Sequence, residues 1–239
     1  MARQAVIRHV TGEMQHKKES RLRDFILGWQ DGMVNVLGVI LGVAAATNDT
    51  KVIIIAGLAA TFAESISMMA VAYTSFKAEL DFYKAERKKE ETEVRDIPEV
   101  ERKEVSDIFG KMGFKGKLLD NLVKHITANK KRWIDTMMDM ELGLSLPKHS
   151  PLNIALIVGA SAFIGSFIPL IPFVLLPVQT AIYTSLIIAT VVLFFVGVYK
   201  AKTTVGNWLR GGLEMALIGM IAALVGYGIG AIAGVALAG

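Results

Sequence analysis

The sequence predicts an all-α polytopic membrane protein with five transmembrane helices and a helical domain inserted between the second and third spans. Of the 239 residues, 53% are hydrophobic. The apolar residues gather in five runs long enough to cross a bilayer as helices, which takes about 20 residues each. Charged residues fall almost entirely within residues 1–24 and 77–150. This separation indicates a membrane protein with a polar domain rather than a soluble globule.

The five apolar runs are the candidate spans, and they cover residues 25–47, 52–76, 152–174, 178–199 and 210–238. The second run joins the charged segment without a break, so we expect its helix to extend beyond the bilayer. Pro169, Pro172 and Pro177 indicate a short uncharged turn between the third and fourth spans. The resulting division is an N-terminal segment, spans 1 and 2, an insert, and spans 3 to 5, at residues 1–24, 25–76, 77–150 and 151–239.

The insert is predicted to be a small helical bundle. A charged helix over 77–95 should stop at Asp96-Ile97-Pro98, because proline is tolerated only in the first turn of the next helix. A second helix is expected over 99–111, and Gly113 and Gly116 mark the following turn. A third helix carries an apolar stripe at helical spacing. That stripe comprises Leu118, Leu119, Leu122, Val123 and Ile126, and a last segment carries Trp133 and Ile134.

Basic residues predict the orientation, because Lys and Arg concentrate in cytoplasmic loops. Several precede the first span, Lys51 alone lies between spans 1 and 2, and three lie between spans 4 and 5, namely Lys200, Lys202 and Arg210. The N-terminus and the insert are therefore expected in the cytoplasm and the C-terminus outside. We find no targeting segment, which favours a prokaryotic plasma membrane.

Composition excludes several functions. There is no cysteine, which excludes disulfides, thiolate metal sites and cysteine nucleophiles. The net charge of +4 is attributed to cytoplasmic loops and not to nucleic-acid binding. The four histidines are scattered, and no phosphate loop or nucleophile elbow is present. The sequence therefore does not predict an enzyme.

Polar residues inside the first two spans suggest a transport pathway. Asp31 and Asn35 lie one turn apart in the first span, as do Glu64 and Met68 in the second. An ionisable residue at that depth costs about 2.5–3.5 kcal/mol on insertion scales, so it usually serves a function. Oxygen and sulfur ligands together suit Fe²⁺ or Mn²⁺ better than Mg²⁺. The structural alternatives are that Asp31 caps or pairs near the interface and that Met68 fills the core.

Within the insert, carboxylates and thioethers suggest a cytoplasmic metal-binding domain. The candidate ligands recur at helical spacing, and they are Glu90, Glu93, Glu101, Glu104, Met137, Met138 and Glu141. Like charges at this spacing repel, and a bound cation relieves the repulsion. The alternative is a solvated helix whose glutamates pair with neighbouring lysines and arginines, with the methionines packing the bundle core.

Two further features favour structural roles. Glu214 follows Arg210 by one helical turn, and we expect the two to form an ion pair at the interface. Glycines at four-residue intervals allow close helix approach, either within one chain or across a dimer. They are Gly38 and Gly42 in the first span and Gly226, Gly230 and Gly234 in the last.

The sequence resembles the vacuolar iron transporter family over nearly its whole length. Gly57-Leu58-Ala59 with Ile66-Ser67-Met68 and Tyr73 is similar to that family's second-span signature. The stretch Met137-Met138-Asp139-Met140-Glu141-Leu142-Gly143-Leu144 is similar to the close of its metal-binding domain. The resemblance implies a homodimer that exports Fe²⁺ and Mn²⁺ from the cytosol in exchange for protons. It also implies that Asp31 and Met68 line the pore and that Glu90, Glu93, Glu101, Glu104, Met137 and Glu141 bind metal.

The chain departs from the family pattern in the second span. The family carries a glutamate directly after Gly-Leu-Ala, where this chain has Ala60, and often an acidic residue before the tyrosine, where it has Ala72. Glu64 lies one turn beyond Ala60 on the same face. The carboxylate has moved by one turn, or the chain represents a branch with altered selectivity, altered proton coupling or no transport.

Together these observations predict export of Fe²⁺ or Mn²⁺, contributing to metal homeostasis and detoxification, with Zn²⁺ or Co²⁺ as further ions for the insert. The resemblance implies that this export is coupled to protons. The expected partners are divalent metal ions, protons, the lipid bilayer and a second copy of the chain. The alternative is a non-transporting membrane metal sensor or adaptor, which would not need the carboxylates of Asp31 and Glu64 inside the bilayer. A Mg²⁺ or Ca²⁺ transporter ranks third and a membrane enzyme last.

Overall fold

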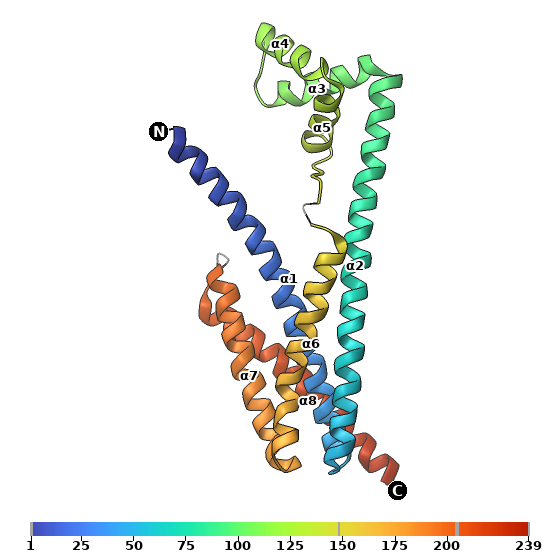
Figure 1. The fold of residues 1–239 in the computed structure, drawn as a ribbon, viewed down its shortest axis with the longest axis vertical. Coiled ribbons are helices and arrows are strands. Elements are labelled where there is room, and N and C mark those ends of the chain that lie inside the picture. Colours follow the sequence, from blue (N-terminus) through green and yellow to red (C-terminus); the bar gives the residue numbers. More distant parts are fainter. Residues whose placement is uncertain (1, 148, 204–205, 239) are drawn as a thin grey trace. The chain divides into compact units, whose positions relative to one another are not determined.

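The structure, a computed structural model, describes residues 2–147, 149–203 and 206–238. Within these ranges the protein is all-helical, with eight helices and no strand (Figure 1). The chain divides into two compact units. One comprises Met1–Tyr73 and Pro151–Gly239, and the other comprises Thr74–Ser150. We call these the membrane unit and the insert unit.

Among the residues described, five helices are long and apolar enough to cross a bilayer; four lie within the membrane unit, and the second begins there. They are Leu22–Ala46, Thr50–Asp96, Pro151–Leu175, Val178–Thr203 and Trp208–Gly234. The chain is therefore an integral membrane protein, and the prediction of five spans is confirmed. In the helix that begins at Thr50, only the first part has the composition of a span, because residues 77–96 are rich in charge.

These spans belong to longer helices. The first lies in α1 (Ala2–Ala46), so the N-terminal segment and span 1 form one helix. The second lies in α2 (Thr50–Asp96), which continues without a break into the insert unit, as the sequence predicted. The remaining spans lie in α6 (Pro151–Leu175), α7 (Val178–Thr203) and α8 (Trp208–Ala238).

The turn between the third and fourth spans differs from the prediction. Pro169 and Pro172 lie inside α6, and only Leu176 and Pro177 separate α6 from α7. Each proline removes one N–H from the helix. Transmembrane helices tolerate such losses where neighbouring helices satisfy the backbone. The carbonyl groups that lose their helical partner are those of Gly165 and Ile168, four residues before each proline. Close by, the buried Ser185 hydroxyl of α7 donates to the Pro169 carbonyl oxygen at 2.7 Å, which links α6 to α7.

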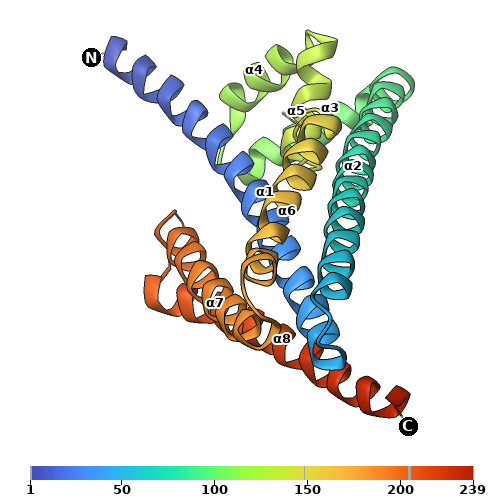
Figure 2. The ribbon, with the colours of Figure 1, turned by 60° about the horizontal axis from the view of Figure 1, so that its bottom comes forward.

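Small residues set how closely the membrane helices approach. α1 packs along α6 on one side and α8 on another (Figures 1 and 2). A Cβ added to Gly42 would lie 2.8 Å from the Gly226 carbonyl oxygen, and one added to Gly226 or Gly230 would meet the backbone of Gly38 or Gly42. The predicted role of these glycines in close packing is therefore confirmed, within one chain. The core beside them is apolar, with Met33, Val36, Ile40, Phe173 and Leu193 fully buried.

The insert unit combines the end of α2 with three short helices. They are α3 (Pro98–Lys111), α4 (Gly116–Thr127) and α5 (Lys130–Met140). α2 ends at Asp96 and Pro98 opens α3, as predicted. Gly113 and Gly116 have φ of +100° and +55°, a backbone region that glycine adopts without strain. The insert core contains Tyr83, Val94, Val105, Ile126, Trp133, Ile134, Met137 and Met138.

Candidate functional site

Five glutamates from three helices of the insert unit form one acidic cluster. Glu90 and Glu93 lie one turn apart on α2, Glu101 and Glu104 one turn apart on α3, and Glu141 at the C-terminal cap of α5. Each pair shares a helix face because residues three apart are neighbours on a helix. Their negative charges act on one another across the helices. We call this set the glutamate cluster.

Two members of the glutamate cluster are almost completely buried. Glu90 is 3% exposed and Glu101 is 2% exposed. In each, the Oε2 atom is buried and has no hydrogen-bond partner among the described residues. A buried carboxylate without a partner is costly, so its surroundings favour either a proton or a cation.

Electrostatics in the glutamate cluster follow from this burial. Burial, and after it the negative charge of the neighbouring glutamates, raises the pKa of Glu90 and of Glu101 to about 7. The pKa of Glu141 is also raised, by burial first and then by Glu104 and Glu93. Near neutral pH the cluster therefore holds protons that a divalent cation can displace.

Glu90 and Glu101 do not fit the alternative that the sequence left open, a solvated face neutralised by basic neighbours, because both are buried. Within the described part of the chain, only Glu93 of the cluster has an ion pair, with Lys89 at 3.9 Å. Arg102, which the alternative would pair with the cluster, is instead bonded to Glu99 at 2.9 Å. The cluster therefore keeps an uncompensated negative charge.

The side chains of the cluster lie within electrostatic range of one another but not in a coordinating arrangement. Among the residues described, no three His, Asp or Glu side chains are positioned to hold a metal ion. Binding a cation between α2, α3 and α5 would therefore need rotation of the glutamate side chains. Such rotations are open to the partly exposed members, such as Glu93 and Glu104.

Met137 and Met138 occupy a different environment. Their side chains are 0% and 1% exposed, and both belong to the apolar core with Trp133 and Val105. Core packing accounts for their burial, so the carboxylates carry the argument for a cation site in this unit. The predicted ligand role of the two thioethers stays a prediction.

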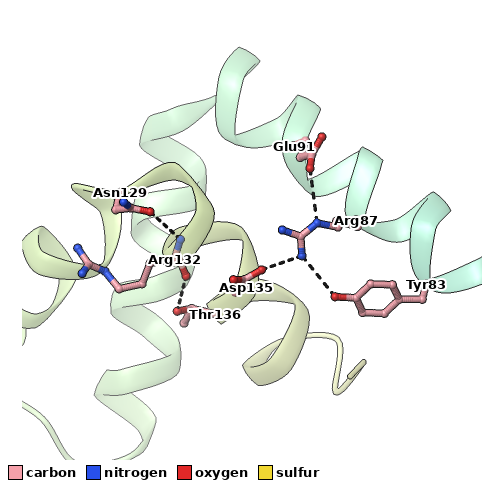
Figure 3. Close-up of polar contacts among 7 residues, drawn as sticks. All are labelled: Tyr83, Arg87, Glu91, Asn129, Arg132, Asp135 and Thr136. Atoms are coloured by element: carbon pink, nitrogen blue, oxygen red, sulfur yellow. Dashed lines mark hydrogen bonds and ion pairs between the residues drawn. The ribbon is translucent and has the colours of Figure 1, made fainter. Parts of the chain in front are cut away.

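An ion-pair network that the sequence did not predict joins α2 to α5 (Figure 3). Arg87 Nη1 donates to Asp135 Oδ1 at 2.7 Å and to the Tyr83 hydroxyl oxygen at 3.3 Å. Arg87 Nε also lies 3.6 Å from Glu91 Oε1. The hydrogen bond to Asp135, first among the causes, raises the pKa of Arg87. Arg87 precedes Glu90 by one turn, and Asp135 lies on the helix that Glu141 caps, so the network holds two of the cluster's helices together.

Local hydrogen bonds, also drawn in Figure 3, fix the start of α5. The Asn129 side chain accepts a hydrogen bond from the Arg132 backbone N–H at 3.0 Å, as an N-cap residue does. The Thr136 hydroxyl donates to the Arg132 carbonyl oxygen at 2.8 Å. A well-defined α5 fixes the position of Glu141 at its other end.

In the membrane unit, the structure brings together three of the four predicted pathway residues. The Glu64 side chain of α2 lies near Asp31 and Asn35 of α1, close enough for their polar groups to act on its carboxyl group. Met68 lies one turn beyond Glu64 on the same helix face and is half-buried. Two carboxyl groups and one side-chain amide thus lie near one another between the first two spans.

Nearby hydroxyl groups do not compete for these carboxylates. Thr61 donates to the Gly57 carbonyl oxygen at 2.8 Å, and Ser65 donates to the Thr61 carbonyl oxygen at 2.6 Å. Ala72 is 8% exposed, and Ala60 packs at the edge of the apolar core. Glu64 is therefore the carboxylate that the second span presents to Asp31.

Three other charged residues, Arg210, Glu214 and Asp24, differ from expectation. The predicted ion pair between Arg210 and Glu214 is absent from the ion pairs of the described residues, and both side chains instead line a cavity of about 230 Å³. Helical spacing alone did not bring the two side chains into contact, and both are exposed. Asp24, which the sequence assigned to the N-terminal segment, is 3% exposed and lies 3.2 Å from Arg23 Nη2. The only sequence signal for the burial of Asp24 was its position directly before the first apolar run, which begins at residue 25.

The amino-acid sequence is similar to those of known membrane transporters. The sequence model described as VIT family matches residues 22–231. The chain is 33% identical over 208 residues to vacuolar iron transporter 1 of Arabidopsis thaliana, covering 86% of this chain and 83% of that protein. It is 33% identical over 233 residues to the vacuolar iron transporter of Plasmodium falciparum, covering 92% and 85%. For the vacuolar iron transporter of Centaurea cyanus the identity is 32% over 210 residues, covering 87% and 86%. These proteins are named as transporters, and the prediction that the chain is not an enzyme is confirmed.

Proposed function

Because the chain belongs to the VIT family, we propose that it exports a divalent transition metal, Fe²⁺ or Mn²⁺, from the cytosol across a membrane in exchange for protons. Its relatives carry the name of vacuolar iron transporters. The observation that carries the proposal is the proximity of Glu64 to Asp31 and Asn35. A protein that only anchors a sensor has no need of two carboxylates between its spans.

The proposed pathway uses the chemistry of these side chains. Oxygen atoms of Asp31, Asn35 and Glu64 replace part of the hydration shell of the metal, and the Met68 thioether adds a softer ligand. A metal ion and a proton compete for the same carboxylate oxygens. A proton that binds as the metal leaves therefore completes the exchange.

The insert unit is proposed as the cytoplasmic metal-binding domain, over residues 77–150. The glutamate cluster attracts divalent cations and raises their concentration near the membrane. The two buried members, Glu90 and Glu101, exchange their protons for the cation. Carboxylate sites follow the general affinity order of divalent metals, so Co²⁺ and Zn²⁺ are expected to bind there as well.

Orientation and membrane are proposed from the distribution of basic residues. The N-terminus and the insert unit lie in the cytoplasm and the C-terminus lies outside, because Lys and Arg gather on the cytoplasmic side. A prokaryotic plasma membrane stays a prediction from the sequence, since the relatives compared above are eukaryotic and carry vacuolar names.

A homodimer is proposed because one chain leaves the pathway residues open. Asn35 is exposed and Glu64 is only half-buried. Val71 lies two turns beyond Glu64 on the same face of α2 and is 58% exposed. A second copy packed against this face would separate the carboxylates from lipid, which otherwise raises the cost of charging them.

The test is metal flux into proteoliposomes that contain a quenchable dye. Fe²⁺ and Mn²⁺ are offered with and without a pH gradient to wild type, Asp31→Ala and Glu64→Ala, with the exposed Glu99→Ala as the matched control. We expect gradient-dependent flux that both pathway variants lose and the control retains. If well-folded wild type binds metal but shows no flux, the proposal that the protein transports metal is wrong.

That negative result would favour the second candidate, a membrane metal sensor or adaptor. The observation in its favour is the second span itself, where Ala60 and Ala72 stand at positions that are acidic in the pattern of the family. Retained flux in Glu64→Ala would instead show that transport does not depend on the carboxylate one turn from Ala60.

A further inference from the structure

A cavity opens in the membrane unit where α7 and α8 separate. The two helices lie side by side (Figures 1 and 2) and touch at Gly197 and Gly211, where a Cβ on Gly211 would lie 2.9 Å from the Gly197 carbonyl oxygen. Toward the N-terminus of α8 a cavity of about 230 Å³ lies between them and α1. Its polar lining consists of Gln30, Lys200, Asn207, Arg210 and Glu214.

A second cavity adjoins the first on the outer face of α8. It has a volume of about 470 Å³ and shares Asn207, Arg210 and Glu214 with the first. The rest of its lining is apolar, formed by Leu209, Leu213 and Leu217, which are 46%, 49% and 55% exposed. The polar chamber thus continues into a shallow, open apolar groove over one face of α8.

The polar chamber favours an anion. Two cations, Lys200 and Arg210, face it against one carboxylate, that of Glu214. The Arg210 guanidinium makes no hydrogen bond or ion pair with any described residue, so its five N–H donors are available to a ligand. The chamber also lies at the start of α8, where Asn207 Oδ1 accepts from the backbone N–H groups of Leu209 and Arg210 at 3.0 and 3.4 Å. The positive end of the helix dipole adds to the attraction.

We propose that the two joined cavities bind an anionic phospholipid. The phosphate of the headgroup contacts Arg210 and Lys200, and one acyl chain follows Leu209, Leu213 and Leu217. Guanidinium is suited to bidentate recognition of phosphate, and basic pockets between membrane helices bind anionic headgroups on the cytoplasmic side. Trp208, 52% exposed beside the chamber, is the kind of residue found at the level of lipid headgroups.

A lipid fits better than a free phosphate ion because both halves of the site are used. A free ion would occupy the polar chamber and leave the leucine groove without a role. Binding would also adjoin the transport pathway on α1, since Gln30 of the chamber directly precedes Asp31. The proposal does not depend on which metal is transported or on transport itself.

The test is calorimetric titration of the full-length protein in detergent with short-chain phosphatidylglycerol, short-chain phosphatidylcholine and inorganic phosphate. We expect phosphatidylglycerol to bind and phosphatidylcholine not to. Arg210→Gln should weaken binding about tenfold, the loss expected for one charge-assisted contact. Glu214→Gln is the matched control, because removing a carboxylate from an anion site leaves binding unchanged or tighter.

Leu213→Trp separates the two ligand sources by filling the groove. It should weaken phosphatidylglycerol binding and leave Arg210 accessible. Equal binding of phosphatidylglycerol by wild type and Arg210→Gln overturns the proposal, as does equal binding of the two lipids. Inorganic phosphate that binds as tightly as phosphatidylglycerol, with both unaffected by Leu213→Trp, identifies a free ion and also overturns it. Circular dichroism of each variant establishes that it is folded.

Discussion

At the scale of single residues, the burial of Glu90 and Glu101 makes the stability of the insert unit depend on pH. Their pKa of about 7 exceeds the value of about 4.3 for glutamate in an unfolded chain. The folded state therefore binds more protons than the unfolded state between these values. The stability that protonation provides is complete below pH 4 and is lost as the pH rises through about 7.

We therefore predict that the metal-free insert unit is less stable at pH 8 than at pH 5, by on the order of 2 kcal/mol for each of the two residues. Urea unfolding followed by the fluorescence of buried Trp133 measures this, with Trp29 and Trp208 replaced by Phe. Glu90→Gln and Glu101→Gln should flatten the pH dependence. Glu99→Gln, at an exposed position on α3, should leave it unchanged. A wild type that is equally stable at both pH values contradicts the prediction.

The same protons govern metal binding. Because a cation must displace them, affinity for Mn²⁺ should rise between pH 6 and 8, and calorimetry in buffers of different ionisation enthalpy should detect proton release on binding. Glu90→Gln should weaken binding at least about tenfold. Met137→Leu, which removes the sulfur and nearly conserves volume, should leave affinity unchanged if packing is its whole role. Binding without proton release would show that the metal is held away from Glu90 and Glu101.

At the scale of helices, the ion pair between Arg87 and Asp135 links α2 to α5 and is expected to stabilise the insert unit. Arg87 is 26% exposed and Asp135 is 41% exposed, so the pair is only partly shielded from water. We predict a coupling free energy of about 1 kcal/mol in a double-mutant cycle with Arg87→Gln and Asp135→Asn. Urea unfolding provides the four free energies that the cycle needs.

The matched control for that cycle is the pair of Lys77 and Asp81. These two side chains are 51% and 52% exposed and lie on a single helix. Their coupling should be no more than about 0.5 kcal/mol, as for other exposed pairs one turn apart. The exchanged pair Arg87→Asp with Asp135→Arg should recover part of the lost stability. Equal coupling in both pairs would show that the link between α2 and α5 contributes nothing beyond an ordinary surface contact.

Helix boundaries were predictable where their cause is local. Proline at position 98 ends one helix and begins another because of its own missing N–H, and Gly113 permits the positive φ of the next turn. Pro169 and Pro172 were misplaced because a proline inside a transmembrane helix is tolerated or not according to the helices packed around it. The residues next to these prolines in the sequence do not show which helices pack around them.

In the candidate sites, too, features with a local cause were predictable and contacts between distant residues were not. Helical spacing predicted which glutamates share a face on α2 and on α3, and it placed Asp31 beside Asn35. It could not show that α3 and α5 bring Glu101 and Glu141 to Glu90, because that depends on how the helices pack. The contact between Arg87 and Asp135 joins positions 48 residues apart and had no sequence signal. The ion pair expected for Arg210 failed for the opposite reason, because correct spacing does not determine side-chain direction.

At the scale of the whole molecule, a single chain leaves the face of α2 that bears Glu64 exposed, so an enclosed ion pathway needs a second chain. The face of α2 that bears Glu64 also bears Val71, which is 58% exposed, whereas Ile66, 65% exposed, lies on the opposite face. Both side chains are equally accessible in one chain. A homodimer that encloses the carboxylates covers Val71 and leaves Ile66 facing lipid.

Because the chain has no cysteine, a single introduced thiol can report which face of α2, that of Val71 or that of Ile66, meets the second copy. We predict that Val71→Cys forms disulfide-linked dimers in membranes treated with a bilayer-permeant oxidant, and that Ile66→Cys, on the same helix and equally exposed, remains monomeric on a non-reducing gel. Both variants carry one thiol at similar depth, so a difference between them reports which face of α2 meets the second copy. Crosslinking at Ile66→Cys alone would place the partner on the face away from Glu64 and leave the carboxylates open to lipid, which contradicts a pathway enclosed between two chains.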